Sequence, residues 1–157
     1  MEQIKPTTNI NLSYYVEVKR LRKDAILPTL GSLYSAGYDL RACIDFPITI
    51  QAHSTVLIGT GLAITPPEGY FGAIFARSGL ASKQGLRPAN CVGVCDYDYT
   101  GEYKVALHND TDGEQIVNPQ DRIAQLVFLP YINCTFIEVD ELKDFARGSN
   151  GFGSTGN

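Results

Sequence analysis

The sequence has few of the residues that bind zinc or build disulfide frameworks, because its 157 residues include two histidines and four cysteines. The cysteines, Cys43, Cys91, Cys95 and Cys134, form no Cys-x-x-Cys pair and lie mostly within apolar stretches. We interpret them as buried free thiols and not as a zinc site or a set of disulfides. Free thiols predict an intracellular, reducing compartment, either the cytoplasm or the nucleus.

Long apolar runs and excess positive charge are also absent. No run of about 18 apolar residues occurs, so the sequence predicts no membrane-spanning helix. The segment Met1–Leu12 is polar and lacks the apolar core of a secretory signal. The 13 basic residues are outnumbered by 17 acidic ones, and the net charge of −4 argues against direct nucleic-acid binding.

The sequence is rich in short alternating segments that are separated by turns, with 15 glycines and 8 prolines. Strands are expected over Tyr14–Leu21, Asp45–Gln51, Val56–Ile64, Tyr70–Ala76, Ile123–Leu129 and Tyr131–Val139. One short helix is expected over Ser78–Gln84, ended by Gly85, and one helical turn over Glu141–Phe145. This pattern predicts a single all-β domain, a barrel or a sandwich.

The sequence predicts three regions along the chain. Residues 1–35 hold an N-terminal arm, whose start we expect to be mobile, and the first strand. The β domain itself spans residues 14–146, and residues 147–157 form a glycine-rich C-terminal arm. The first 35 residues contain no motif with an evident chemical role.

The stretch Asn90–Asn109 predicts a strand, a tight polar turn and a returning strand. In the returning strand, apolar residues recur at every second position from Tyr103. The turn carries two carboxylates, Asp96 and Asp98, with Tyr99 beside them. A hairpin that opens into a pocket can hold a carboxylate and a ring around a small planar ligand. Ordinary turn chemistry explains the same residues when they are taken alone.

Four further polar clusters interrupt the β pattern at strand ends and in loops, where binding groups collect. They are Ala36–Leu40, Ala76–Ala81, Asp121–Leu126 and Arg147–Gly156. In the second cluster, Arg77, Ser78 and backbone N–H groups suit a phosphate, although Ser78 as a helix cap is an equal alternative. The last cluster has the composition of a disordered tail. It also contains Phe152, which is an unusual residue to leave in water.

In this order and at these separations, the clusters resemble the five motifs of the trimeric dUTP pyrophosphatase (dUTPase) family. The motifs are Ala36–Leu40, Arg77–Ala81, Gly93–Glu102, Asp121–Leu126 and Arg147–Gly156. One motif alone is weak evidence, whereas five in register are specific. The resemblance implies a jelly-roll-like distorted β-barrel that assembles as a homotrimer with active sites at subunit interfaces. It also implies Mg2+-dependent hydrolysis of dUTP to dUMP and pyrophosphate, which limits uracil incorporation into DNA and supplies dUMP for thymidylate synthesis.

The resemblance further implies a role for each motif residue. Asp96 is the catalytic carboxylate that activates the attacking water, and Tyr99 packs under the deoxyribose, where a ribose 2′-hydroxyl has no room. Asp39 contacts a metal-bound water, and Asp121 pairs with Arg77. The implied substrate-binding residues are Arg77, Ser78, Gly79, Asn90, Gly93, Val94, Cys95, Asp96, Tyr99, Lys104, Gln125, Arg147, Phe152, Gly153, Ser154 and Thr155.

Within this set, Asn90 and the backbone around Cys95 and Lys104 read uracil. Arg77, Ser78 and Gly79 cradle the phosphates, with Gln125 nearby. The C-terminal arm closes over the nucleotide: Phe152 covers the base, while Arg147, Ser154 and Thr155 hold the γ-phosphate. Departures from the family pattern are Ala76 for proline, Cys95 for isoleucine, and Gln120 and Asn150 for glycine, and none of them removes a group that the reaction needs.

Three rival interpretations remain at the level of sequence. The first is a dCTP deaminase, whose family has a similar fold. That family carries a catalytic glutamate at the position where this chain has Ala106. A non-catalytic nucleotide sensor would bind dUTP together with a protein partner, and the intact Asp96 argues against loss of catalysis. A purely structural β protein would leave Phe152 in a glycine-rich tail unexplained.

Overall fold

The computed structural model describes residues 14–145 and 148–149, which form an all-β domain with one short helix. Its elements are β1 (Glu17–Arg20), β2 (Thr29–Leu30), β3 (Tyr38–Arg41), β4 (Ile48–Ile50), β5 (Thr55–Gly59), β6 (Leu62–Thr65), β7 (Tyr70–Phe75), α1 (Ser78–Gln84), β8 (Leu86–Pro88), β9 (Val92–Cys95), β10 (Lys104–Asn109), β11 (Gln115–Val117) and β12 (Arg122–Pro130). The expected all-β class and short helix are confirmed.

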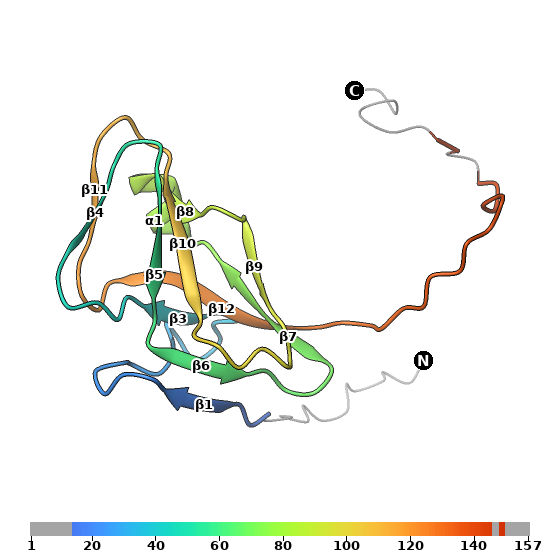
Figure 1. Ribbon diagram of the computed structural model, residues 1–157, viewed down its shortest axis with the longest axis horizontal. Helices are drawn as coiled ribbons and strands as arrows, with labels where there is room; N and C mark the ends of the chain where they lie inside the picture. Colours follow the sequence, from blue (N-terminus) through green and yellow to red (C-terminus); the bar gives the residue numbers. More distant parts are fainter. Residues whose placement is uncertain (1–13, 146–147, 150–157) are drawn as a thin grey trace, which may run out of the picture.

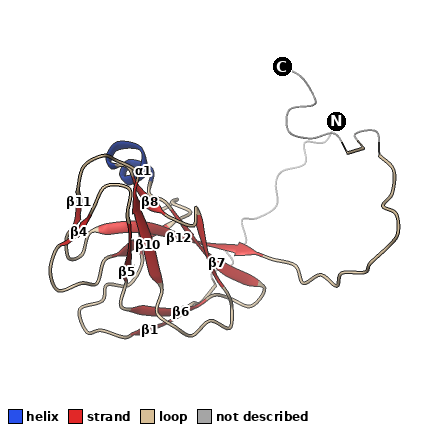
Figure 2. Cartoon of the chain, turned by 45° about the horizontal axis from the view of Figure 1, so that its top comes forward, coloured by secondary structure: helices blue, strands red, loops and turns tan. Residues whose placement is uncertain are grey.

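The strands form four antiparallel sheets that close around one core, as Figures 1 and 2 show. The largest sheet has the order β2-β3-β12-β7-β9, and a second has the order β5-β10-β8. Two-stranded sheets, β1-β6 and β4-β11, complete the barrel. Among the described residues no helix is long and apolar enough to cross a membrane.

The core is built by alternating residues of the strands, as their sequence pattern predicts. On β10, Val105 and Leu107 are buried, and Tyr103 just before the strand is 1% exposed. Their partners across the barrel include Leu40 on β3 and Leu126 on β12, which are also buried. Burial of large apolar side chains contributes roughly 1.5–3 kcal/mol each, so this alternation decides which face of each strand turns inward.

Helix α1 begins and ends where the sequence predicts. Gly85 follows it with φ +66°, and its N–H bonds to the carbonyl of Leu80, as in a left-handed C-cap. A Cβ at Gly85 would lie 2.5 Å from Thr111 Cγ2, so a larger residue is also excluded by space. At the other end the N-cap residue is Arg77, and no side chain caps the helix. Ser78 is therefore not engaged as a cap, which favours the alternative that its hydroxyl faces a ligand.

Two predicted strand arrangements are wrong. The expected strand Val56–Ile64 breaks into β5 and β6, because Gly61 adopts φ +68° between them. The expected hairpin around Asp96 is an arch: β9 pairs with β7, whereas β10 pairs with β5 and β8. We call residues 96–103, which connect β9 to β10, the arch. Its two strands belong to different sheets, so the connection passes from one sheet to another instead of turning within one sheet.

The segment after β12 also differs from prediction. Residues 131–145 contain neither the strand expected over Tyr131–Val139 nor the helical turn expected over Glu141–Phe145. They run away from the barrel as an extended chain, which Figures 1 and 2 both show. The apolar side chains of Phe136 (96% exposed), Ile132 and Ile137 are left in solvent. A strand needs a hydrogen-bonded neighbour, and within the described chain only the first residue of this segment has one, where the N–H of Tyr131 bonds to the carbonyl of Gly69 at 3.1 Å.

The cysteines are free, as expected, but their burial is mixed. Cys43 and Cys95 lie in the core, whereas Cys91 and Cys134 are exposed. Cys91 occupies a turn with φ +61°, and Cys134 lies on the extended segment after β12. The apolar neighbours of Cys134 in the sequence predicted burial because the segment was expected to pack as a strand.

Candidate active site

One cavity, of about 430 Å³, collects the predicted phosphate-binding residues, and we call it the cradle. Its lining residues are Gly31, Ser35, Ala36, Gly37, Asp39, Arg77, Ser78, Gly79, Arg122, Gln125 and Val127. The residues come from the loop before β3, the junction between β7 and α1, and the start of β12. These elements meet because β3 and β7 flank β12, where Gln125 lies opposite both Asp39 and Phe75.

An ion-pair cluster occupies the floor of the cradle. Arg77 Nε donates to Asp39 Oδ1 at 2.8 Å, and Arg122 donates to Asp39 Oδ2 at 3.2 Å. The Asp39 side chain is only 13% exposed, so solvent screens these pairs less than it screens surface pairs. Ser78 and Gly79 are exposed at the rim. The cradle therefore presents guanidinium and hydroxyl donors together with open backbone, as a phosphate requires.

Asp121 is not the partner of Arg77, contrary to prediction. Its carboxylate accepts from the backbone N–H of Asn118 at 2.7 Å and closes the turn before β12. Asp39 takes the arginine because β3 pairs directly with β12 and brings its carboxylate to the end of β7. This pairing depends on strand register, which the separate motifs do not reveal.

Gln125 fixes the wall of the cradle. Its Nε2 donates to the carbonyl of Ala76 at 2.9 Å, which turns its Oε1 toward Gly37. A Cβ at Gly37 would lie 2.6 Å from that oxygen. Glycine is therefore required beside Asp39 so that the loop before β3 can approach β12.

The predicted catalytic carboxylate lies at the arch. Asp96 directly follows β9, is exposed, and lines a separate hollow of about 540 Å³ together with Phe71, Val94, Tyr97, Asp98, Tyr131 and Asn133. The Asp96 carbonyl accepts from the N–H of Tyr99 at 3.2 Å, which sets the turn. Tyr99 in turn donates its hydroxyl to the carbonyl of Glu102 at 3.1 Å. Asp96 and the Tyr99 ring are thus held on one short, hydrogen-bonded loop.

The arch is fastened to the bend between β5 and β6. Glu102 Oε1 accepts from the N–H of Gly61 at 2.8 Å, and Thr60 Oγ1 donates to the carbonyl of Tyr103 at 2.7 Å. The N–H of Tyr103 bonds to the carbonyl of Leu62 at 2.8 Å. These contacts hold the loop that carries Asp96 against the barrel.

Two titratable groups lie buried beneath the arch. Burial raises the pKa of the Cys95 thiol to about 11, and the pKa of the Tyr103 hydroxyl also lies above its ordinary value because of burial. Both groups therefore remain neutral at physiological pH. Among the described residues, the Tyr103 hydroxyl has no oxygen or nitrogen partner.

The predicted uracil-reading residues lie around β9. Asn90 and Val94 are exposed, whereas Gly93 and Cys95 are buried in the strand. A Cβ at Gly93 would lie 3.2 Å from Ile74 Cβ, so the neighbouring strand leaves little room for a side chain there. Lys104, at the start of β10, lies 3.4 Å from the Glu102 carboxylate.

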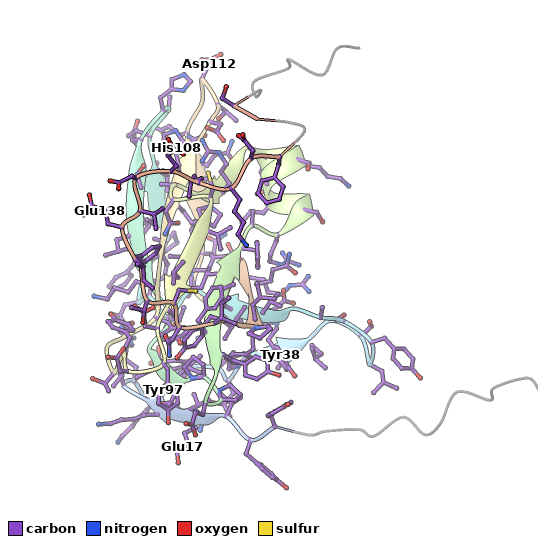
Figure 3. All side chains as sticks on the ribbon, turned by 90° about the vertical axis from the view of Figure 1, so that its right-hand side faces the viewer. Glu17, Tyr38, Tyr97, His108, Asp112 and Glu138 are labelled. Atoms are coloured by element: carbon purple, nitrogen blue, oxygen red, sulfur yellow. The ribbon has the colours of Figure 1, made fainter. Side chains whose placement is uncertain are left out.

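One chain does not bring the cradle and the arch together. Cys95 lies opposite Gly72 near one end of β7, whereas Arg77 follows the other end of that strand. The six residue-to-residue steps of extended chain from Phe71 to Arg77 span about 20 Å. Figure 3 shows Tyr97 of the arch toward the same end of the barrel as Glu17, with Asp112 toward the opposite end. Arg147, Phe152, Gly153, Ser154 and Thr155 lie outside the described residues.

Comparisons with known proteins show the family to which the chain belongs. The family model described as dUTPase matches residues 23–156. The chain belongs to the dUTPase family. It is 45% identical over 139 residues to the deoxyuridine 5′-triphosphate nucleotidohydrolase of Hydrogenobaculum sp., covering 88% of this chain and 96% of the relative. It is 48% identical over 147 residues to that of Desulfitobacterium hafniense, covering 92% and 97%.

Solved dUTPase structures share the fold. The Staphylococcus bacteriophage 80alpha dUTPase with dUpNHpp is 28% identical with a TM-score of 0.84, covering 92% of this chain and all of that one. The dUTPase of phage phi11 of S. aureus is 25% identical with a TM-score of 0.76, covering 84% of this chain. The jelly-roll-like barrel expected from the motifs is confirmed.

Sequence reasoning missed three residues that shape this dUTPase site. Arg122 shares Asp39 with Arg77, Glu102 anchors the arch, and Thr60 helps to anchor it. Arg122 lies inside the fourth motif beside Asp121, so its position in the sequence could have identified it as a site residue. Glu102 likewise stands at the end of the third motif, whereas Thr60 lies in no motif and acts across 43 residues of sequence.

Proposed function

We propose that this chain hydrolyses dUTP to dUMP and pyrophosphate by water attack on the α-phosphorus, at a site shared between copies of the chain. Membership of the dUTPase family makes dUTP hydrolysis its activity. The observation that carries the shared site is the separation of the cradle from the arch. Phosphate-binding groups lie at one end of β7 and the carboxylate lies near the other, so a single chain does not supply both to one nucleotide.

The segment 131–145 supports assembly into the homotrimer. It exposes apolar side chains such as Ile132, Phe136 and Leu142, which is costly in an isolated chain. Fifteen extended residues reach roughly 50 Å, far enough to cross to a neighbouring barrel. On the receiving side, a groove of about 780 Å³ lies between the sheets and is lined by Tyr14, Val16, Val18, Pro28, Leu33, Ala36, Tyr38, Ile64, Pro67, Tyr70, Leu126 and Phe128.

In the proposed reaction, Asp96 accepts a hydrogen bond from the attacking water and takes its proton as the bond to phosphorus forms. General-base help of this kind is typically worth about 10²–10⁴-fold in rate. Arg77, Ser78 and Gly79 of another copy hold the phosphates and stabilise the charge that grows on their oxygens. Pyrophosphate leaves, and its charge is compensated in the cradle.

Mg2+ fits this arrangement as an ion that arrives with the triphosphate. The described residues include no group of three or more His, Cys, Asp or Glu side chains that could hold a metal. In the part of the chain that the structure describes, Asp39 is the only acidic residue that lines the cradle, and both of its oxygens already accept from arginines. Phosphate oxygens would therefore supply most ligands, with Asp39 accepting from a metal-bound water. When bound, Mg2+ neutralises phosphate charge.

Specificity follows from the arch and from the C-terminal arm. The Tyr99 ring would pack under the deoxyribose and exclude a 2′-hydroxyl, and Asn90 with the backbone of β9 and Lys104 would read uracil. Residues 147–157 would close over the nucleotide, with Phe152 on the base. Deamination of dCTP is disfavoured because Ala106, on β10, provides no acid or base. Free thiols suit the reducing cytoplasm, and the bacterial relatives give no support for the nucleus.

The sharpest test mixes two inactive variants, Asp96→Asn and Arg77→Ala. Each variant alone should release pyrophosphate from dUTP at less than about 1% of the normal rate. If the site is shared, refolding them together at equal amounts restores an intact pairing at about one quarter of the sites. A mixture that stays as inactive as its components, with mixed assembly verified by differently tagged chains, would show that Asp96 and Arg77 serve the same chain.

A further inference from the structure

The cradle contains a second guanidinium, on Arg122, which the proposed reaction does not use. Arg77 and Arg122 bond to opposite oxygens of Asp39, at 2.8 and 3.2 Å. Arg77 Nη1 also donates to the backbone carbonyl of Arg122 at 3.4 Å. The three residues therefore form one connected cluster in which the carboxylate is the shared acceptor.

The charges of this cluster leave one positive charge in excess. Among the described residues that line the cradle, Asp39, Arg77 and Arg122 are the only charged ones. Arg122 is the most exposed of the three, at 46%, against 26% for Arg77 and 13% for Asp39. The excess positive charge suits a phosphate, but the more deeply placed guanidinium is engaged by the carboxylate.

A phosphate that binds Arg77 competes with Asp39 for that guanidinium. If Arg77 turned away and no other cation were present, Asp39 would be left charged, largely buried and unpaired, which strongly disfavours the change. Arg122 removes this obstacle because it already bonds to the other carboxylate oxygen.

We propose that Arg122 is a positioning residue that keeps Asp39 neutralised while Arg77 exchanges that carboxylate for a phosphate oxygen of the substrate. Arg122 acts through Asp39 and does not itself contact the phosphates. The inference rests on the proposed function, because it requires the triphosphate to bind in the cradle.

A double-mutant cycle tests this role with dUTP turnover and with binding of the imido analogue dUpNHpp in the presence of Mg2+. Arg122→Ala should raise the KM for dUTP and the Kd for dUpNHpp about tenfold, with kcat changed less than about threefold. Arg122→Lys, which restores the charge, should recover most of the loss. In an Asp39→Asn background, Arg122→Ala should change the Kd by less than about twofold, because no carboxylate remains to be neutralised.

Two results would overturn the proposal. An equal loss in both backgrounds would show that Arg122 binds phosphate directly, and no loss in the normal background would show that it has no role. Arg22→Ala is the matched control, because Arg22 pairs with Asp24 and Asp45 outside the cradle and should leave the KM unchanged. If Arg122→Ala does not fold, as judged by circular dichroism, Arg122→Gln carries the same comparison.

If the proposed function is wrong, the variants should give a different pattern of dUpNHpp affinities from the one expected if only the role of Arg122 is wrong. If the triphosphate does not bind in the cradle, Arg77→Ala binds dUpNHpp as tightly as the unchanged protein. If Arg77→Ala weakens binding but the Arg122 cycle shows no coupling, the cradle is correct and only the role of Arg122 is wrong.

Discussion

The ring of Tyr99 lies 6.2 Å from the ring of Tyr103, with 31° between their planes. Tyr103 is 1% exposed and belongs to the core, whereas Tyr99 is 45% exposed at the arch. One face of Tyr99 therefore rests on the buried core, and its hydroxyl is tied to the carbonyl of Glu102. A Cβ at Gly101 would lie 2.5 Å from the Tyr99 hydroxyl oxygen, so glycine is needed for the ring to adopt this position.

This support predicts that the ring of Tyr99, more than its hydroxyl, excludes ribose. Tyr99→Ala should lower the preference for dUTP over UTP, measured as the ratio of kcat/KM values, by at least about tenfold. Tyr99→Phe keeps the ring and loses one hydrogen bond to a carbonyl, so the preference should stay within about threefold. Equal losses in both variants would contradict a steric role for the ring.

A second prediction concerns Asn109, whose side chain is fully buried at the end of β10. Its Nδ2 donates to the carbonyls of Ile50, Gln51 and Gly113, and its Oδ1 accepts from the N–H and hydroxyl of Thr111. Asn109→Ala should lower the free energy of unfolding by about 3 kcal/mol or more, because several buried polar groups lose their partner at once.

Urea unfolding at fixed protein concentration measures this loss, since the proposed assembly would make the midpoint depend on concentration. The control is Asn118→Ala, because the Asn118 side chain makes one exposed bond to Asp121 at 3.3 Å. It should cost less than about 1 kcal/mol. A similar loss in both variants would mean that the Asn109 network does not stabilise the barrel.

A third prediction follows from the buried thiol of Cys95, whose pKa is raised to about 11 by burial. An unfolded chain loses this proton near pH 9, whereas the folded chain retains it to about pH 11. Between these values the folded state binds more protons, so the free energy of unfolding falls as pH rises, by at most about 1.4 kcal/mol per pH unit for one group. Cys95→Ala should flatten this fall, measured by urea midpoints at pH 8, 9 and 10. An unchanged slope would assign the fall to other groups.

The correct predictions rest on local signals. The alternation around Val105 and Leu107 is a property of one strand, and the stop of α1 needs only the left-handed conformation of Gly85. The residues Arg77, Ser78, Gly79 and Gln125 fell into one cavity because their motifs stand at strand ends that the sheet brings together.

The errors arise where distant parts of the chain decide the structure. The bend at Gly61 is stabilised by Glu102, 41 residues away, and the glycine within Val56–Ile64 does not by itself distinguish a bend from a continuous strand. Arg77 pairs with Asp39 and not with Asp121 because the register between β3 and β12 places the Asp39 carboxylate beside it. The residues of Tyr131–Val139 have the composition of a strand, but a strand forms only where a neighbouring strand provides backbone hydrogen bonds.

The last prediction separates the two parts of the C-terminal region by truncation. Deleting Gly148–Asn157 removes the arm that we expect to close over the nucleotide but leaves the apolar residues of 131–145. This variant should keep the trimer, measured by sedimentation, and lose nearly all turnover of dUTP, because water and substrate are no longer enclosed. Deleting residues 131–157 also removes Ile132, Phe136 and Ile137, and should leave a monomer without activity. Full activity in the shorter deletion would refute closure by the arm. A stable trimer in the longer deletion would show that the exposed segment does not hold the subunits together.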